Sequence, residues 1–269
     1  MTATPRRLAL ALAVLLAAGG VAAGAREDVR ADDAVRVVRQ IQAIPEASIP
    51  DRLLDDAHAI VVVPDTIKAS FMFGGRHGLG LMSVKSADGT WSNPVFVKLS
   101  GASFGFQAGV QSADVILVFR SQRGLDNIMN GKITLGADAG VAAGPVGRNA
   151  AAATDGAMKA EIWSWSRARG LFAGVALDGA VLSIDNGANR TAYGQDATPR
   201  MIFEGRAPQA PSAAITAFRN SLEEATAAAR YARQRANPNP APVATPGAST
   251  PQPLGNDTPA TTTPLPPTR

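Results

Sequence analysis

Glycine recurs inside segments of this chain that otherwise alternate like β-strands, and this feature restricts the fold more than any other. Glycine within a strand weakens it, because the chain loses more entropy and no side chain packs there. Such glycines mark tight curvature, β-bulges or close approach of two backbones. The pattern therefore predicts a strongly curved, barrel-like sheet, and the glycines concerned are Gly101, Gly105, Gly109, Gly136, Gly140, Gly144, Gly174 and Gly179.

Strand signals follow one another with short turns between them, which favours an antiparallel sheet over βαβ units. Residues 59–63 form a β-branched run that Pro64 is expected to end. Asp88-Gly89, between the alternating segments 81–85 and 91–99, predicts a hairpin with a type I′ turn. Further strands are expected at 102–110, 115–119, 132–143, 161–167, 171–177 and 181–185.

Helical patterns flank this region on both sides. Apolar residues at helical spacing predict a helix over 27–44 that Pro45 ends, and a short helix is expected over 50–56. A helical turn is expected over 122–129, and residues 211–235 predict a closing helix with Ile215, Phe218 and Leu222 on one face. We therefore expect residues 26–235 to form one α+β domain, in which helices from both ends pack on the curved antiparallel sheet.

The first 25 residues have the pattern of a secretory signal peptide. Arg6-Arg7 precede an apolar stretch over 8–18, and Ala23-Gly24-Ala25 forms a small-x-small cleavage site. The apolar stretch is too short to span a bilayer, and Gly19-Gly20 is expected to break a helix after residue 18. The pattern predicts export to the periplasm or the exterior, with an uncleaved anchor helix as the alternative.

Residues 236–269 differ in composition from the rest of the chain. Ten of these 34 residues are proline, and the only charged ones are Asp257 and Arg269. Such a segment buries too little apolar surface to offset its chain entropy, so we predict a disordered tail. It is expected to act as a spacer, with a proline-rich ligand for an SH3-like partner as the alternative.

Charge and cysteine content exclude several classes of protein. The chain has no cysteine, which excludes disulfides and thiolate metal sites. Its net charge is +4, and removal of Arg6 and Arg7 with the leader lowers it to 4 − 2 = +2. This small charge, without basic runs that carry aromatic residues, argues against nucleic-acid binding.

Motifs for catalysis, metals and cofactors do not match this sequence. The chain has two histidines, His58 and His77, and no G-x-S-x-G element. The glycine-rich residues 74–80 resemble a phosphate loop, but a strand pattern and not a helix follows them. We therefore expect a flexible turn there. Residues 130–132 lack the remainder of a Walker motif. We therefore expect a noncatalytic protein without a metal or a cofactor.

Five segments within residues 49–194 form a recognisable set: GGRHGLG (74–80), SFGFQAGVQSADVILVF (103–119), LGADAGVAAGPVGRNA (135–150), WSWSRARGLFAGVALDGAVL (163–182) and DNGANRTAYG (185–194). Together they resemble the SYLF domain family, as an exported bacterial-type member. The resemblance implies a noncatalytic phospholipid-binding module, with phosphoinositides as ligands of eukaryotic members and actin as a further partner of fungal ones. Because the predicted leader places this chain outside the cytosol, we expect an anionic membrane phospholipid as the ligand.

Arginines within or next to these motifs are the candidate lipid-binding residues, because each contributes about 1 kcal/mol near an anionic membrane surface. Arg167 and Arg169 share a strand face with Trp163 and Trp165, and tryptophan is suited to the membrane interface. The alternatives are core packing for the tryptophans and solvated surface for the arginines. An envelope scaffold with a protein partner is the alternative function. The full candidate set is Arg148, Arg167, Arg169, Arg76, Arg190, Trp163 and Trp165.

Overall fold

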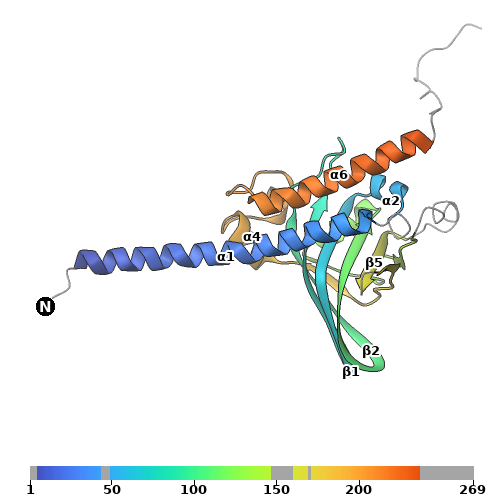
Figure 1. Ribbon diagram of the computed structural model, residues 1–269, viewed down its shortest axis with the longest axis horizontal. Helices are drawn as coiled ribbons and strands as arrows, with labels where there is room; N and C mark the ends of the chain where they lie inside the picture. The colour runs from blue at the N-terminus through green and yellow to red at the C-terminus, as the bar shows by residue number, and fades with distance from the viewer. Residues whose placement is uncertain (1–4, 44–48, 147–159, 169–170, 237–269) are drawn as a thin grey trace, which may run out of the picture.

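The computed structural model describes residues 5–43, 49–146, 160–168 and 171–236. Seven strands in the described residues form one curved sheet, and α1 and α6 lie along the same side of it (Figure 1). The expected α+β architecture is confirmed. In chain order the elements are α1 (Pro5–Gln42), α2 (Asp51–Asp55), β1 (Ala59–Val84), β2 (Val95–Phe119), α3 (Gln122–Met129), β3 (Lys132–Thr134), β4 (Val141–Ala143), β5 (Ile162–Ala168), β6 (Leu171–Gly174), β7 (Val181–Ile184), α4 (Asn186–Tyr193), α5 (Pro199–Phe203) and α6 (Ala213–Ala236).

β1 and β2 form one long antiparallel hairpin that is bent near its middle. Pairing runs from Ala59 opposite Phe119 to Met82 opposite Val95, with a register shift between Ser70 and Met72. Figure 1 shows both strands running away from α1 and α6 to a common end and then returning. The first half of β2 pairs with β7 and its second half with β5, so the bent hairpin curves the sheet into a half-barrel.

Two glycines let the halves of β1 lie against each other. A Cβ on Gly80 would lie 2.2 Å from the carbonyl oxygen of Val62, and a Cβ on Gly78 would lie 2.5 Å from Cγ1 of Val63. Real Cβ atoms essentially never approach other atoms so closely. The prediction that strand glycines mark close backbone approach is thus confirmed here, whereas residues 74–80 are part of β1 and not a flexible turn.

Some predicted strand boundaries are wrong. Pro64 does not end β1, because a register shift between Val63 and Thr66 accommodates it, with Asp65 at a φ of 43°. The predicted strands 102–110 and 115–119 are parts of β2, and the predicted strand 132–143 is divided into β3 and β4. The sheet is also not wholly antiparallel, since β4 pairs with β5 in parallel.

The hairpin turn lies where Asp88-Gly89 predicted it, but it is not of type I′. That type needs positive φ at both central residues, and here Gly89 alone is left-handed, at 87°. The carboxylate of Asp88 accepts hydrogen bonds from the backbone N–H and the hydroxyl of Thr90, at 3.0 and 2.7 Å. These bonds are typical of an Asx turn, which favours a right-handed backbone at the aspartate.

The helices agree with the predicted ones except at the N-terminus. α2, α3 and α6 lie within a few residues of their predicted ranges, while α4 and α5 were not predicted. α1 is continuous through Gly19-Gly20, so the expected break is wrong. Each glycine disfavours a helix by about 1 kcal/mol relative to alanine, which is too little to interrupt a run of leucine and alanine. Among the residues with described side chains, no helix is both long and apolar enough to cross a membrane.

Asp185 joins three elements next to the helix layer. Its carboxylate accepts the N–H of Ala188 at 3.2 Å at the start of α4, and it pairs with Lys98 of β2 at 3.1 Å and with Arg30 of α1 at 3.2 Å. Burial by itself raises the pKa of Asp185, but the Ala188 hydrogen bond, Lys98 and Arg30 together hold it below its ordinary value of 3.8. The ionised form is therefore stabilised by the fold.

This lowered pKa predicts a pH-dependent loss of stability for Asp185→Asn. The carboxylate stabilises the fold above its unfolded-state pKa, and the stabilisation is lost as the pH falls through the lower folded-state value. We expect the substitution to lower the free energy of unfolding by about 1–2 kcal/mol at neutral pH, with the difference from wild type disappearing in acid. Urea unfolding across this pH range measures it, with exposed Asp196→Asn as the control. A pH-independent difference would contradict the assignment.

Candidate functional site

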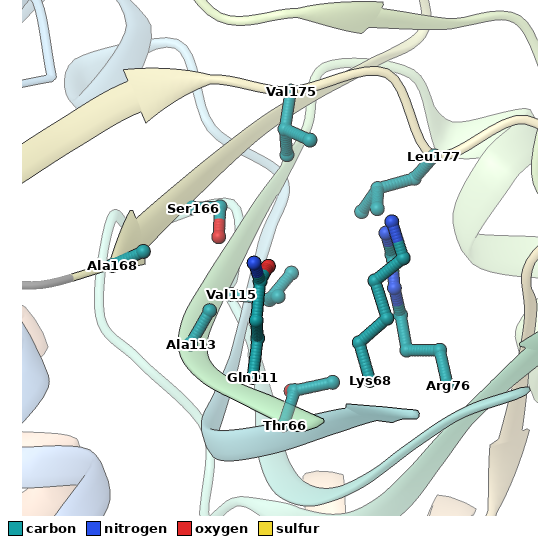
Figure 2. Close-up of a pocket in the computed structure, with 10 residues that line it drawn as sticks. All are labelled: Thr66, Lys68, Arg76, Gln111, Ala113, Val115, Ser166, Ala168, Val175 and Leu177. Carbon is teal, nitrogen blue, oxygen red and sulfur yellow. The ribbon is translucent and has the colours of Figure 1, made fainter. Parts of the chain in front are cut away.

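A pocket of about 170 Å³ lies between the two halves of the bent hairpin and β5 (Figure 2). Its wall has an apolar part and a polar part. The apolar part is made by Ala113, Val115, Ala168, Val175 and Leu177, and the polar part by Thr66, Lys68, Arg76, Gln111 and Ser166.

The bend of the hairpin brings the polar residues together. Lys68 pairs with Gln111 across the two strands, and Thr66 pairs with Ala113. Arg76 lies on the returning half of β1, eight positions after Lys68. In Figure 2 the side chains of Lys68 and Arg76 both extend from the bent β1 into the pocket.

Neither of these cations has a counter-ion in the described part of the chain. No ion pair or hydrogen bond joins Lys68 or Arg76 through its side chain to another described residue. Burial lowers the pKa of Arg76, although a guanidinium remains protonated in proteins. Two neighbouring positive charges in partly desolvated positions attract an anion more strongly than solvated ones do. The pocket is therefore a candidate anion-binding site.

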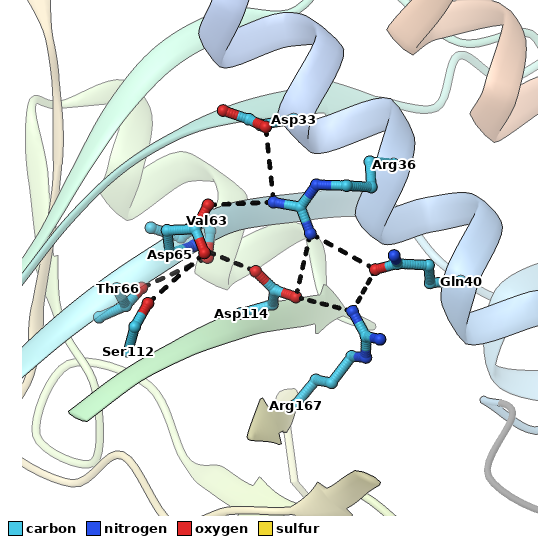
Figure 3. A network of polar contacts seen from close by, with 9 residues as sticks. All are labelled: Asp33, Arg36, Gln40, Val63, Asp65, Thr66, Ser112, Asp114 and Arg167. Carbon is cyan, nitrogen blue, oxygen red and sulfur yellow. Dashed lines mark hydrogen bonds and ion pairs between the residues drawn. The ribbon is translucent and has the colours of Figure 1, made fainter. Parts of the chain in front are cut away.

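A polar network beside the pocket ties α1 to the sheet (Figure 3). Asp114 of β2, whose side chain is 6% exposed, pairs with Arg167 of β5 at 3.5 Å and with Arg36 of α1 at 3.7 Å. Arg36 also pairs with Asp65 of β1 at 3.0 Å, and Gln40 of α1 accepts a hydrogen bond from Arg167. Since Ala113 and Val115 flank Asp114 in the sequence, the network supports the wall of the pocket.

Part of the chain matches a known protein family. Residues 100–225 match the family described as Ysc84, a Las17-binding protein actin regulator. Residues 100–225 of this chain are thus similar to the Ysc84 family. The match confirms the resemblance to the SYLF domain; it begins at residue 100, after the glycine-rich segment 74–80, and ends at residue 225 in α6.

The relatives include SH3-containing proteins. The chain is 39% identical over 175 residues to "SH3 domain-containing protein PJ696.02" of Schizosaccharomyces pombe, which covers 64% of this chain and 40% of the relative. It is 36% identical over 169 residues to "Protein YSC84" of Saccharomyces cerevisiae, and this match covers 61% of the chain and 36% of the relative. It is 31% identical over 185 residues to the human "SH3 domain-containing YSC84-like protein 1", and this match covers 66% of the chain and 54% of the relative. The chain thus spans between about a third and about half of the length of these relatives.

The structure separates the arginines that were predicted to bind lipid. Arg76 lies in the pocket, while Arg167 pairs with Asp114 and lies 5.6 Å from the centre of the Phe172 ring. Arg190 is exposed on α4, which lies away from the bend of the hairpin in Figure 1. The remaining two, Arg148 and Arg169, lie outside the described residues.

Both predicted tryptophans pack in the core. Trp165 is fully buried, its indole N–H donates to the carbonyl of Pro145 at 3.0 Å, and Trp163 is 7% exposed. A Cβ on Gly144 would lie 2.0 Å from the Trp165 ring, so this glycine makes room for the indole. The core-packing alternative is therefore the one observed, and the expected exposed face of tryptophans and arginines is not present.

Four polar residues of the pocket were not predicted from the sequence, and they are Lys68, Gln111, Thr66 and Ser166. For Lys68, however, the sequence contains a signal. Between Asp65 and Asp114 the chain has only one acidic residue, Asp88, and this lies in the hairpin turn. Lys68 and Arg76 thus occur in a long acid-free segment. Within the described residues, no group of His, Cys, Asp and Glu is placed to hold a metal ion.

Proposed function

We propose that this domain is a noncatalytic module that binds anionic phospholipid membranes through the hairpin bend, defined as residues 67–79 of β1 and 98–112 of β2. The observation that carries the proposal is the pair Lys68 and Arg76, which has no acidic partner among the described residues. Anionic head groups attract each such cation by about 1 kcal/mol near the surface. Because the chain is nearly neutral overall, the attraction must be local.

Apolar residues at the same bend support a membrane-facing role. Ile67 is 53% exposed and Leu79 is 36% exposed, although both are large apolar side chains. The strand segments that meet at the bend, 69–73 and 103–110, contain four phenylalanines and no charged residue. Cations beside apolar side chains are typical of surfaces that bind reversibly to the membrane interface.

The position of the bend also suits a peripheral module. Figure 1 shows it at the end of the sheet farthest from α6, whereas Asp88 lies in the turn at the other end of the hairpin. The membrane would thus meet a surface without acidic side chains, and the helix layer would face away from it. Export through residues 1–25 is part of the same proposal and places the membrane outside the cytosol.

Vesicle co-sedimentation tests the proposal directly. We expect the protein to bind vesicles containing phosphatidylglycerol, and we expect Lys68→Gln/Arg76→Gln to weaken this binding about 30-fold, since two cations contribute about 1 kcal/mol each. Salt should weaken the wild type in the same direction. Lys132→Gln/Arg190→Gln removes two exposed cations outside the bend and serves as the matched control.

Two results would contradict this assignment. The first is equal loss of binding in the double variant and the control, which would mean that cations attract the membrane regardless of position. The second is equally tight binding to phosphatidylcholine vesicles at high salt, which would indicate apolar insertion without charge recognition. In that case Ile67→Ser/Leu79→Ser, and not the charge variant, should abolish binding.

A protein partner is the second candidate function. The matched family is described as a Las17-binding protein actin regulator, which favours an interaction of this kind. Co-sedimentation with purified actin filaments separates the two candidates. Binding to filaments together with no binding to any vesicle would favour the protein partner and contradict the membrane proposal.

A further inference from the structure

The pocket inside the hairpin bend is too small for most ligands but large enough for one anionic group. A cavity of about 150 Å³ accommodates a molecule the size of benzene, whereas pockets for drug-sized ligands and cofactors occupy roughly 300–1,000 Å³. At about 170 Å³ the pocket has no room for a complete acyl chain or a nucleotide. Its ligand must therefore be a compact group.

The polar residues around the pocket have the chemistry that a phosphate group requires. Lys68 and Arg76 supply positive charge and N–H donors from the two halves of the bent strand β1. Arginine binds phosphate with two parallel hydrogen bonds, while lysine acts as a point charge. Gln111 and Ser166 add neutral groups that can donate hydrogen bonds to the remaining oxygens, whereas the Thr66 hydroxyl already donates to the carbonyl of Val63 at 3.3 Å.

Among the described residues that line this pocket none is acidic, which distinguishes the pocket from an ordinary buried ion pair. Elsewhere in the described residues, several partly buried arginines have an acidic partner, as Arg30 has Asp185 and Arg167 has Asp114. The described wall of this pocket holds two cations and no carboxylate, and burial disfavours the charged form of Arg76. A bound dianion would neutralise both cations and replace the hydration that they lose through burial.

We propose that the pocket between Lys68 and Arg76 is a saturable site for a single phosphate group, either free phosphate or the terminal phosphomonoester of a ligand head group. This inference deepens the proposed membrane binding, because the pocket lies at the same hairpin bend. It differs from that proposal in predicting a stoichiometric site that recognises a soluble ligand. General attraction to a charged surface predicts no such site.

Calorimetric titration of the purified protein with inorganic phosphate tests the site without a membrane. We expect one phosphate per chain, with sulfate competing and chloride at equal ionic strength without effect. Lys68→Gln and Arg76→Gln should each weaken binding about tenfold, and Lys68→Arg, which keeps the charge, should retain it. Lys132→Gln, which removes an exposed cation outside the pocket, should bind phosphate as the wild type does.

Thermal unfolding provides a second readout that guards against misfolded variants. Phosphate should raise the Tm of the wild type and of Lys68→Arg, and it should not raise that of Arg76→Gln. In the absence of phosphate, Arg76→Gln should be at least as stable as the wild type, because it removes an uncompensated charge. A wild type that fails to bind phosphate, or a double variant that binds it normally, would overturn the proposal.

Vesicles of matched surface charge distinguish the source of the phosphate. Phosphatidic acid ends in a phosphomonoester, whereas phosphatidylglycerol has only a phosphodiester. Stronger binding to phosphatidic acid, reversed by inorganic phosphate, would support a lipid head group as the ligand. Binding of soluble phosphate without binding to either vesicle would support the site and contradict the membrane proposal. Vesicle binding that phosphate does not compete with and Lys68→Gln/Arg76→Gln does not weaken would overturn the site.

Discussion

Replacing Gly80 by alanine is expected to destabilise the domain by about 3 kcal/mol or more, because the added methyl group has no space. Its Cβ would lie 2.2 Å from the carbonyl oxygen of Val62 and 2.8 Å from the Cα of Val63. These are backbone atoms of the facing half of β1, so a change of rotamer cannot relieve the contact. The halves of the hairpin must separate, and the half-barrel must open between them.

The same glycine-rich segment provides a matched control. A Cβ on Gly75 would meet nothing within 4 Å, and its φ lies outside the left-handed region. We expect Gly75→Ala to change the free energy of unfolding by no more than about 0.5 kcal/mol. Urea unfolding of both variants measures the difference. Equal effects of the two substitutions would mean that the close approach of the two halves of β1 is not required for stability.

Replacing Asp114 by alanine is expected to lower the free energy of unfolding by about 2–3 kcal/mol. The substitution removes the shared partner of Arg36 and Arg167 and the acceptor of the Asp65 N–H, which lies 3.1 Å from the carboxylate. Breaking a fully buried pair costs about 3–5 kcal/mol. Since the side chains of Arg36 and Arg167 are 37% and 22% exposed, water recovers part of that loss.

Asp33→Ala is the control for this network. Asp33 also pairs with Arg36, at 3.5 Å, but its side chain is 41% exposed. We expect a loss below about 1 kcal/mol, and we expect salt to reduce it, in contrast to the loss at Asp114. A double-mutant cycle between Asp114→Ala and Arg167→Met isolates the pair. A coupling energy near zero would show that the network does not hold β2 to β5.

Local signals in the sequence were sufficient for several elements. α3 coincides with the predicted helical turn over 122–129, since Ser121 caps it by accepting the N–H of Gly124. α6 follows the apolar spacing of residues 211–235. The position of the hairpin turn was predictable from Asp88-Gly89, although its type was not, because the Thr90 contacts of Asp88 favour a right-handed backbone there.

The position of the candidate site depends on contacts between distant segments of the chain. The alternation of side chains along a strand could not predict it. Alternation shows that Lys68 and Arg76 each lie on a face of a strand, but it does not show that β1 bends between them and brings both to one pocket. For the same reason, the two tryptophans of β5 were predicted on a face with arginines, and the curvature of the half-barrel places them in the core.

A curved, glycine-rich α+β domain of the SYLF type was predictable from the amino-acid sequence, because these features depend on local propensity and on motifs that lie close together in the chain. Three features became evident only in the folded molecule: the need for Gly78 and Gly80, the pairing of Arg167 with Asp114, and the lack of a partner for Lys68 among the described residues. Contacts and charge compensation of this kind depend on segments that are distant in sequence, and no local pattern specifies which of them meet.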